Sequence, residues 1–426
     1  MRVLFIENAG NKSAGAFHSM LTLIRLLRKY GVESYVAVSD KADGLDLLEQ
    51  NRIPYIKMRA CAYTWIISNK AKSAERLKMP FKYAVSKLSS RKLIKYARKN
   101  KIDIIHENTS ACYIGAFAAE HLRIPHVWHI REFMEEDFNA SLWWKKNALR
   151  LINRSDAVIT VSDAISQKYE GQIRKNIIYR IYNGIDVEAF SCQKSKFRFD
   201  EHSNLLCVGR VCEGKGQADV IKALAILKEK YLYEPQLYIA GIYSEEYKNT
   251  IMQPARDADI SENIHFLGQC NNMKELYSSM DILCMSSRKE AFGRVTVEAM
   301  LSELLVVGAD SGGTAEIITE GKTGYLYEAG NAEQLALKLA YVFRNSKEAE
   351  KVKSFSQQVK LLNCYNNIFY VENGKMNCFV NDSENQTVID LADYDLIGMN
   401  LCSVEKLNDN SYVFVNEGEN GIEIVS

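Results

Sequence analysis

The chain has 426 residues, of which 47% are hydrophobic and 25% are charged, and its formal net charge is +1 at pH 7. This composition excludes an intrinsically disordered protein, and a net charge near zero gives no indication of a nucleic-acid partner. A chain of this length is too long for one hydrophobic core of ordinary size, so two domains are expected.

Membrane spans, export and metal binding have no clear signal in the sequence. No apolar run reaches the roughly eighteen residues that a spanning helix needs. The first residues, MRVLFIENAG, lack a basic n-region and a long apolar h-region, so they predict a buried strand rather than a signal peptide. Ten cysteines contain no Cys-x-x-Cys pair, which is typical of reduced cytosolic thiols and argues against a zinc site. We therefore predict a cytoplasmic protein without a bound metal.

Short apolar runs alternate with helical patterns through most of the chain. The first series is VLFIE, SYVAVS, DIIHEN, HVWHI and AVITVS, and the second is NLLCVGR, QLYIAG, NIHFLG, DILCMSS and LLVVGA. Continuously apolar strands are typical of parallel sheets that helices cover on both faces. Two such series predict an α/β protein with two doubly wound, Rossmann-like domains, whose ligands would bind in a cleft at the carboxyl ends of the strands.

The periodicity also predicts where the parts of the chain begin and end. We expect one Rossmann-like domain over residues 1–190, a second over 191–345 and a closing helix over 346–368. Residues 369–426 are rich in acidic residues and in Asn, Asp and Gly between short apolar runs, which predicts a small β extension built from hairpins. No internal repeat is expected.

A basic stretch lies in the first half of the chain. Between Lys70 and Lys101, twelve Lys and Arg residues face a single acidic residue, Glu75, and apolar side chains are interleaved with them. Trp143 and Trp144 precede two further lysines, a mixture that is typical of a membrane interface. We interpret the stretch as a surface that docks on anionic lipid. The alternative is a solvated charged face, and no nucleic-acid-binding motif accompanies it.

The second domain begins with a loop that carries two cations. In CVGRVCEGKGQADVIKAL, a strand, a glycine-containing loop and a helix follow one another, and Arg210 and Lys215 lie in the loop. Cations beside the free N–H groups of a helix start favour a phosphate. The segment is neither a P-loop nor a dinucleotide fingerprint, and an ordinary solvated loop is the alternative.

Two glutamates flank a later strand-to-helix turn. In SSRKEAFGRVTVEAM, Glu290 lies in the turn and Glu298 lies inside the following helix. Carboxylates would repel a phosphate, but they accept hydrogen bonds from the hydroxyls of a sugar or a ribose. We therefore interpret them as clamps for two polyols with phosphates between them. The alternative is a helix-start charge at Glu290 and a surface residue at Glu298. The glycines of GADSGGTAEIITEGKTGYLYE would then allow close backbone approach to the same ligand.

In this order, the segments VGRVCEGKG, IHFLGQ, EAFGRVTVEAM and SGGTAEIITEGKTGYLYE resemble the family-4 retaining glycosyltransferases with the GT-B fold, over about residues 1–368. The resemblance is strongest in the Glu-x7-Glu pattern of Glu290 and Glu298. It implies that Arg210 and Lys215 bind a diphosphate, that Glu298 binds ribose and that Glu290 contacts the transferred sugar. It further implies that the backbone around Phe292, Gly293 and Arg294 approaches the sugar and phosphates. We also expect Gly15, Gly209, Gly268 and Thr323 to contact the sugar nucleotide.

The resemblance also assigns expectations to the first half of the chain. His129 ends an apolar run and is implied to touch the donor sugar and its leaving group. His18, Arg131 and Glu132 are expected near the acceptor, although Arg131 and Glu132 could instead contact each other. The family needs no metal or other cofactor. One departure is AGIY, where Tyr243 replaces a glycine that is common in the family.

The expected function is retaining transfer of a hexose-type sugar from a nucleoside diphosphate sugar to a hydroxyl acceptor, a lipid-linked or surface glycan intermediate. The enzyme would be peripheral at the inner face of the membrane. Alternatives are a sugar-nucleotide epimerase, a glycan phosphorylase and a non-catalytic scaffold with the same fold. The donor base and sugar, the linkage and the oligomeric state stay open.

Overall fold

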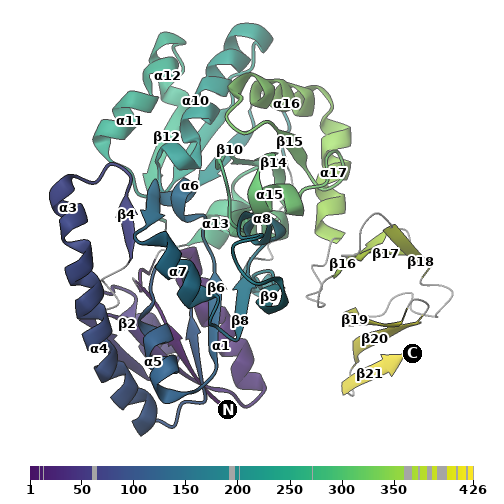
Figure 1. Cartoon of the computed structure of the whole chain (residues 1–426). Helices are drawn as coiled ribbons and strands as arrows, with labels where there is room; N and C mark the ends of the chain where they lie inside the picture. Colours follow the sequence, from purple (N-terminus) through teal and green to yellow (C-terminus); the bar gives the residue numbers. More distant parts are fainter. Residues whose placement is uncertain are drawn as a thin grey trace.

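The computed structural model describes residues 1–358, except residues 9, 13, 60–64, 191–196, 201 and 271, together with six strands between residues 367 and 425. Two α/β domains, each built on one parallel sheet, make up most of the molecule (Figure 1). The predicted fold class is confirmed.

The N-terminal domain has a seven-stranded sheet with the order β3-β2-β1-β5-β6-β8-β9, in which all neighbours are parallel. Its strands are β1 (Arg2–Ile6), β2 (Glu33–Ser39), β3 (Tyr55–Met58), β5 (Ile104–Glu107), β6 (His126–Ile130), β8 (Ala157–Thr160) and β9 (Ile178–Arg180). Its helices are α1 (Gly15–Lys29), α2 (Leu45–Gln50), α3 (Ser73–Leu77), α4 (Met79–Lys99), α5 (Ile114–Leu122), α6 (Met134–Phe138), α7 (Lys145–Ile152), α8 (Asp163–Lys168) and α9 (Val187–Phe190). A separate antiparallel pair joins β4 (Ile66–Ser68) to β7 (Ala140–Leu142).

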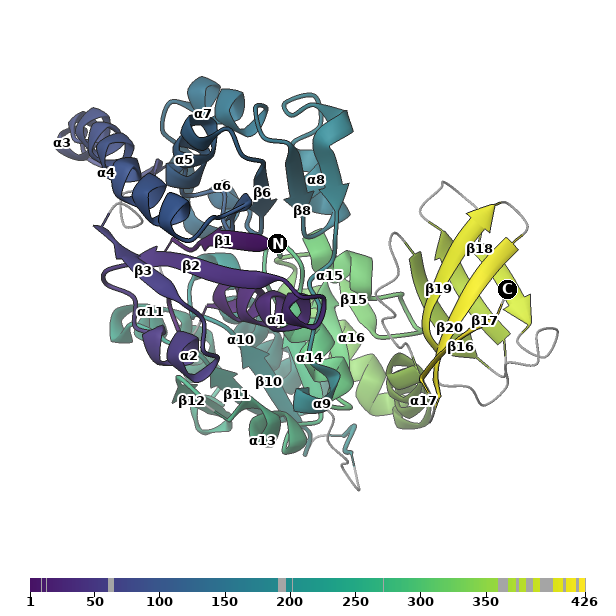
Figure 2. The same ribbon diagram turned by 90° about the horizontal axis from the view of Figure 1, so that it is seen from below.

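Helices cover both faces of this sheet because β1 is apolar on both. Leu4 and Ile6 pack in one core cluster with residues of α4 and α5, whereas Val3 and Phe5 pack in another with residues of α1 and α2. Figure 2 shows these two pairs of helices on opposite sides of the strands. Successive side chains of a strand point to opposite faces, so a continuously apolar run requires this double cover.

The C-terminal domain has a six-stranded sheet with the order β12-β11-β10-β13-β14-β15, again parallel throughout. Its strands are β10 (Asn204–Val208), β11 (Gln236–Ala240), β12 (Ile264–Gly268), β13 (Ile282–Met285), β14 (Leu305–Ala309) and β15 (Tyr325–Tyr327). Its helices are α10 (Gln217–Ile226), α11 (Glu245–Ile251), α12 (Gln253–Asp257), α13 (Met273–Ser278), α14 (Arg294–Leu301), α15 (Gly312–Ile317), α16 (Ala332–Arg344) and α17 (Ser346–Gln358). Leu205 packs in one core cluster with residues of α10 and α16, and Leu206 packs in another with residues of α13 and α14.

The predicted division at residues 190 and 191 falls between β9, which ends at Arg180, and β10, which begins at Asn204. Of the expected closing helix, α17 accounts for the residues up to Gln358, and 359–366 lie outside the described residues.

The C-terminal extension consists of two antiparallel three-stranded sheets. The first contains β16 (Asn367–Glu372), β17 (Lys375–Val380) and β18 (Gln386–Asp390), and the second contains β19 (Leu401–Asn408), β20 (Ser411–Gly418) and β21 (Gly421–Val425). β18 and β21 begin 421 − 386 = 35 residues apart. At the same spacing, FVNDSENQTVI (379–389) and FVNEGENGIEI (414–424) share six of eleven residues. The expectation of no internal repeat is therefore wrong: the extension is a tandem repeat of one β-meander.

Candidate active site at the domain interface

Two loops of the C-terminal domain bring together the residues that we predict to bind the phosphate and the sugar. Gly216, which precedes α10, has φ of +67°, and a Cβ there would lie 2.0 Å from the carbonyl oxygen of Ser286, so a glycine is needed. Ser286 Oγ in turn donates to the Lys215 carbonyl over 2.8 Å. This close packing places Lys215 Nζ 2.8 Å from Glu290 Oε2, although the two residues lie 75 positions apart. Arg210 is exposed, and its guanidinium makes no ion pair or hydrogen bond with the described residues.

The Gly312-Gly313 turn supports the backbone around Glu290. A Cβ on Gly312 would lie 2.2 Å from the Glu290 carbonyl oxygen, and one on Gly313 would lie 2.3 Å from that of Phe292. The Gly313 N–H donates to the Glu290 carbonyl over 2.7 Å. The two glycines therefore allow the start of α15 to fix the turn that carries Glu290.

Glu298 is buried, with 6% of its surface exposed, so the surface-residue alternative is wrong. It lies on α14, which begins after Gly293 at φ of +92°. Arg294 Nε is 2.6 Å from its Oε1, and the Tyr277 hydroxyl donates to its Oε2 over 3.0 Å. Burial raises the pKa of the Glu298 carboxyl, and the Arg294 charge opposes the rise. Each carboxylate oxygen keeps a further lone pair for another donor.

Arg294 extends from α14 to the N-terminal domain. Its Nη1 donates to Ser19 Oγ on α1 over 3.4 Å, and a Cβ on Gly15 would lie 3.7 Å from its Cδ. His18 lies on the same helix, and its Nε2 is 2.8 Å from the Lys12 carbonyl oxygen. Burial is the largest cause that lowers the pKa of His18, and the Arg294 charge adds to it. The structure thus brings Gly15, His18 and Arg294 together across the domain interface.

His129 lies near the end of β6, and Arg131 is the first residue after that strand. Both residues are buried. Arg131 Nη2 is 3.2 Å from His129 Nδ1, its Nε donates to Asn108 Oδ1 over 2.8 Å, and its Nη1 donates to Asn183 Oδ1. Burial and then the Arg131 charge hold the pKa of His129 well below its usual value. Burial also lowers the pKa of Arg131 to about 10, so its guanidinium stays charged at neutral pH.

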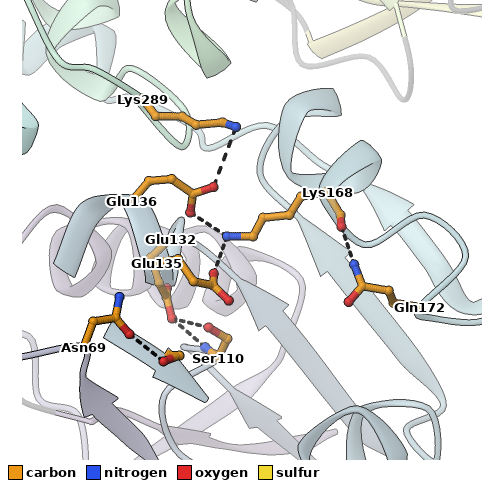
Figure 3. A network of polar contacts seen from close by, with 9 residues as sticks. Asn69, Ser110, Glu132, Glu135, Glu136, Lys168, Gln172 and Lys289 are labelled. Atoms are coloured by element: carbon orange, nitrogen blue, oxygen red, sulfur yellow. Dashed lines mark hydrogen bonds and ion pairs between the residues drawn. The ribbon is translucent and has the colours of Figure 1, made fainter. Parts of the chain in front are cut away.

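Glu132 is held within the N-terminal domain (Figure 3). Its Oε1 accepts hydrogen bonds from Thr109 Oγ1 and from the backbone N–H and hydroxyl of Ser110, over 2.7 to 2.8 Å. The Arg131 backbone N–H donates to its Oε2 over 3.2 Å. The acceptor contacts expected of Arg131 and Glu132 stay predictions, because the contacts described for both side chains are internal.

The other residues that we predict to contact the sugar nucleotide lie in two places. Gly209 and Gly268 are close together at the strand ends, because the Gly241 N–H donates to the Gly268 carbonyl over 2.7 Å and a Cβ on Gly241 would lie 1.9 Å from the Gly209 carbonyl oxygen. Thr323 lies elsewhere, in the turn after α15, where its Oγ1 accepts from the Thr319 N–H over 2.8 Å.

Two interdomain contacts were not predicted. Glu316 on α15 accepts hydrogen bonds from the backbone N–H groups of Asp163 and Ala164 at the start of α8, over 2.9 and 2.7 Å, and from the Tyr182 hydroxyl over 3.1 Å. Lys289 Nζ lies 3.7 Å from Glu136 Oε1, and Glu136 also pairs with Lys168 (Figure 3). Each contact joins residues far apart in the sequence, so no local pattern indicates it.

Two parallel-sheet domains, with two cation–carboxylate pairs beside the second sheet, have the architecture of the GT-B fold that the sequence resemblance implies. The "Glycosyltransferase Family 4" description matches residues 14–189, and "Glycosyl transferases group 1" matches residues 192–359. Together these matches span well over half of the chain, which therefore belongs to the family 4 glycosyltransferases.

Known relatives agree with this assignment. N-acetyl-alpha-D-glucosaminyl L-malate synthase of Bacillus anthracis is 27% identical over 301 residues, which are 66% of this chain and 77% of that protein. Sulfoquinovosyl transferase SQD2 of Arabidopsis thaliana is 29% identical over 293 residues, 64% of this chain and 55% of that one. The chain spans about half the length of several other curated relatives. The crystal structure of Anabaena HepE with UDP and glucose has a TM-score of 0.68 at 24% identity, and the match covers 84% of this chain and 94% of that chain.

Proposed function

We propose that the protein is a retaining, metal-independent glycosyltransferase that moves a hexose-type sugar from a nucleoside diphosphate sugar to a hydroxyl of a lipid-linked or surface glycan intermediate. The observation that carries the proposal is the 2.8 Å contact between Lys215 and Glu290, on loops at the carboxyl ends of two neighbouring strands. A cation and a carboxylate in contact there suit a ligand with a phosphate on one side and sugar hydroxyls on the other.

The proposed reaction uses the leaving group as the base. Arg210 and Lys215 stabilise the departing diphosphate, while Glu290 orients the sugar and Glu298 orients the ribose. The acceptor oxygen bonds to the anomeric carbon on the face from which the diphosphate leaves, and the acceptor proton passes to the released β-phosphate oxygen. The anomeric configuration is thereby retained.

A screen of UDP-, GDP-, dTDP- and ADP-sugars by thermal stabilisation and donor hydrolysis tests this function. UDP-glucose is the first candidate, because HepE has been solved with it. We expect Arg210→Ala to weaken binding of the preferred nucleotide by about 10- to 100-fold, since a charge-assisted hydrogen bond contributes about 1.5–3 kcal/mol. Arg256→Ala, at an exposed arginine of α12, is the matched control and should bind normally. If no nucleotide sugar binds or is hydrolysed, the enzyme proposal fails and a non-catalytic scaffold remains.

We also propose that the α4 surface docks on the inner face of the membrane. We define it as the exposed apolar side chains Leu77 (80% exposed), Phe81 (69%), Leu88 (58%) and Trp144 (55%), with the basic residues of α3 and α4. Phe81 and Leu88, seven positions apart, share one face of α4, and Trp144 lies beside that helix because its ring is 5.8 Å from that of Tyr83. Eleven of the twelve basic residues between Lys70 and Lys101 are exposed. Among the described residues, none of the twelve forms an ion pair, and no helix has the length and hydropathy to cross a membrane.

Arg91→Gln/Lys95→Gln should lower the partition coefficient onto anionic vesicles by about 30-fold, because each basic residue near such a surface contributes about 1 kcal/mol. Both side chains are exposed on α4, one turn apart. Flotation with phosphatidylglycerol vesicles at low salt measures the effect. The control is Lys347→Gln/Lys351→Gln, which removes two exposed charges at the same spacing from α17. Equal loss in both variants, or no flotation of the unmodified protein, would refute docking through this surface.

A further inference from the structure

The contacts of Arg131 determine which nitrogen of His129 carries the proton. A guanidinium has only donors, so a ring nitrogen next to it must accept. Arg131 Nη2 lies 3.2 Å from His129 Nδ1, and the other two nitrogens of Arg131 are used by Asn108 and Asn183. His129 Nδ1 is therefore the unprotonated nitrogen that accepts, and the proton of the neutral ring lies on Nε2. His106 Nε2, 3.2 Å from the same Nδ1, must donate to it as well.

The charged groups around His129 keep its ring neutral. Burial and the Arg131 charge lower its pKa well below the usual value, and His106, whose own pKa burial lowers to about 3, adds to the effect. The charged or titratable groups that face the pair come from β5, the segment after β1, the segment after β6, and α14: His106, Glu7, Glu132 and Arg294. The two carboxylates raise the pKa of Arg131 and so keep it charged.

The Nε2–H of His129 is left as a buried donor. Nε2 has no hydrogen-bond partner among the described residues. A buried donor without an acceptor costs free energy, so such a group in a folded protein calls for an explanation. Arg131, which holds the ring, is close enough to Arg294 on the other domain for the Arg294 charge to lower its pKa. Arg131, which contacts the His129 ring, therefore lies within electrostatic range of Arg294 of the other domain.

We propose that Arg131 is a positioning residue that fixes His129 as a neutral Nε2–H donor to an oxygen of the bound sugar nucleotide. The inference rests on the proposed transferase function, and it adds that His129 is not the general base of the reaction. A general base would need a lone pair facing the ligand, but the lone pair of His129 is turned toward Arg131. His129 therefore does not take the acceptor proton, which passes to the departing phosphate oxygen as the C–O bond to that phosphate breaks.

The ring tautomer can be measured without any substrate. Long-range ¹H–¹⁵N spectra of histidine-labelled protein, with His129→Gln to assign the signal, should show a protonated Nε2 and a bare Nδ1. The pattern should persist between about pH 8 and about pH 5.5, because the neutral ring is held across the range where a free histidine titrates. A proton on Nδ1, or titration of this ring near its usual pKa, would overturn the proposal while leaving the transferase function untouched.

Activity provides the second arm of the test. Arg131→Met should lower kcat by about 10- to 100-fold, since a positioned donor is lost. Without the Arg131 charge the pKa of His129 rises, although burial still lowers it, so the remaining activity should gain an acid limb at a higher pH than any in the unmodified enzyme. Added methylguanidine should restore part of kcat, and Arg154→Met, at an exposed arginine paired with Glu120, should behave as the unmodified enzyme. Absence of any new acid limb in Arg131→Met would contradict the proposal. If that variant does not fold, the tautomer measurement on the unmodified protein decides alone.

Discussion

Replacing Glu290 with glutamine should lower kcat for sugar transfer by about 100-fold or more, while the Kd of the nucleoside diphosphate changes by less than about threefold. The carboxylate lies in the turn before α14, and in the proposed mechanism it orients the sugar rather than the nucleotide. The substitution also removes the negative charge 2.8 Å from Lys215 Nζ, so the net positive charge near the phosphates does not decrease. Single-turnover transfer and calorimetric titration with UDP, GDP, dTDP and ADP separate the two quantities.

Glu333→Gln is a suitable control for this experiment, because Glu333 is an exposed glutamate on α16 of the same domain. It should leave both kcat and Kd unchanged. A Glu290→Gln enzyme that transfers sugar at the normal rate would show that the carboxylate does not hold the sugar. A large loss of nucleotide affinity with normal kcat would assign Glu290 to the nucleotide instead.

Glu316→Ala should destabilise the protein by about 2–4 kcal/mol and loosen the arrangement of the two domains. The Glu316 carboxylate accepts two backbone N–H groups at the start of α8, and a hydrogen bond to a charged group makes a net contribution of about 1.5–3 kcal/mol. It also places a negative charge at a helix N-terminus, which is favourable. Urea denaturation measures the stability, and small-angle scattering measures the radius of gyration, which should increase.

Tyr182→Phe tests one part of the same contact, because it removes only the hydroxyl that donates to Glu316 over 3.1 Å. We expect a loss of about 1 kcal/mol from that variant and little change in the radius of gyration. If Glu316→Ala has the stability and scattering of the unmodified protein, Glu316 does not hold the domains together.

The central strands of both sheets could be predicted, whereas most of the edge strands could not. β1, β5 and β6, like β10 and β13, are covered on both faces, so their sequences are continuously apolar. β9 lies at the edge of its sheet, where Tyr179 is half exposed, and its three residues give too weak a pattern. The tandem repeat was not predicted because its two copies share only six residues of an eleven-residue stretch, three apolar and three polar, which is too few to stand out in the sequence.

In the candidate site, local sequence motifs identified single residues, but they did not predict most of the contacts between residues far apart in the sequence. The proximity of Lys215 and Glu290 follows from the rule that loops at the carboxyl ends of neighbouring parallel strands meet. The contact of Arg131 with Asn183, and that of Glu316 with α8, join segments whose sequences contain no mark of each other. The Glu316 contact depends on how the two domains pack, and the Arg131 contact depends on how distant segments of the N-terminal domain pack. No short sequence pattern encodes either.

At the candidate site, two cations of the C-terminal domain are paired with carboxylates of the protein itself. Lys215 is neutralised by Glu290, and Arg294 by Glu298. An incoming diphosphate must therefore compete with two carboxylates, and each carboxylate that loses its cation needs new donors. A sugar nucleotide brings them in its ribose and hexose hydroxyls, but inorganic pyrophosphate brings none. In the proposed transferase, the two pairs would therefore favour an anion that brings polyols on both sides over an anion that brings none.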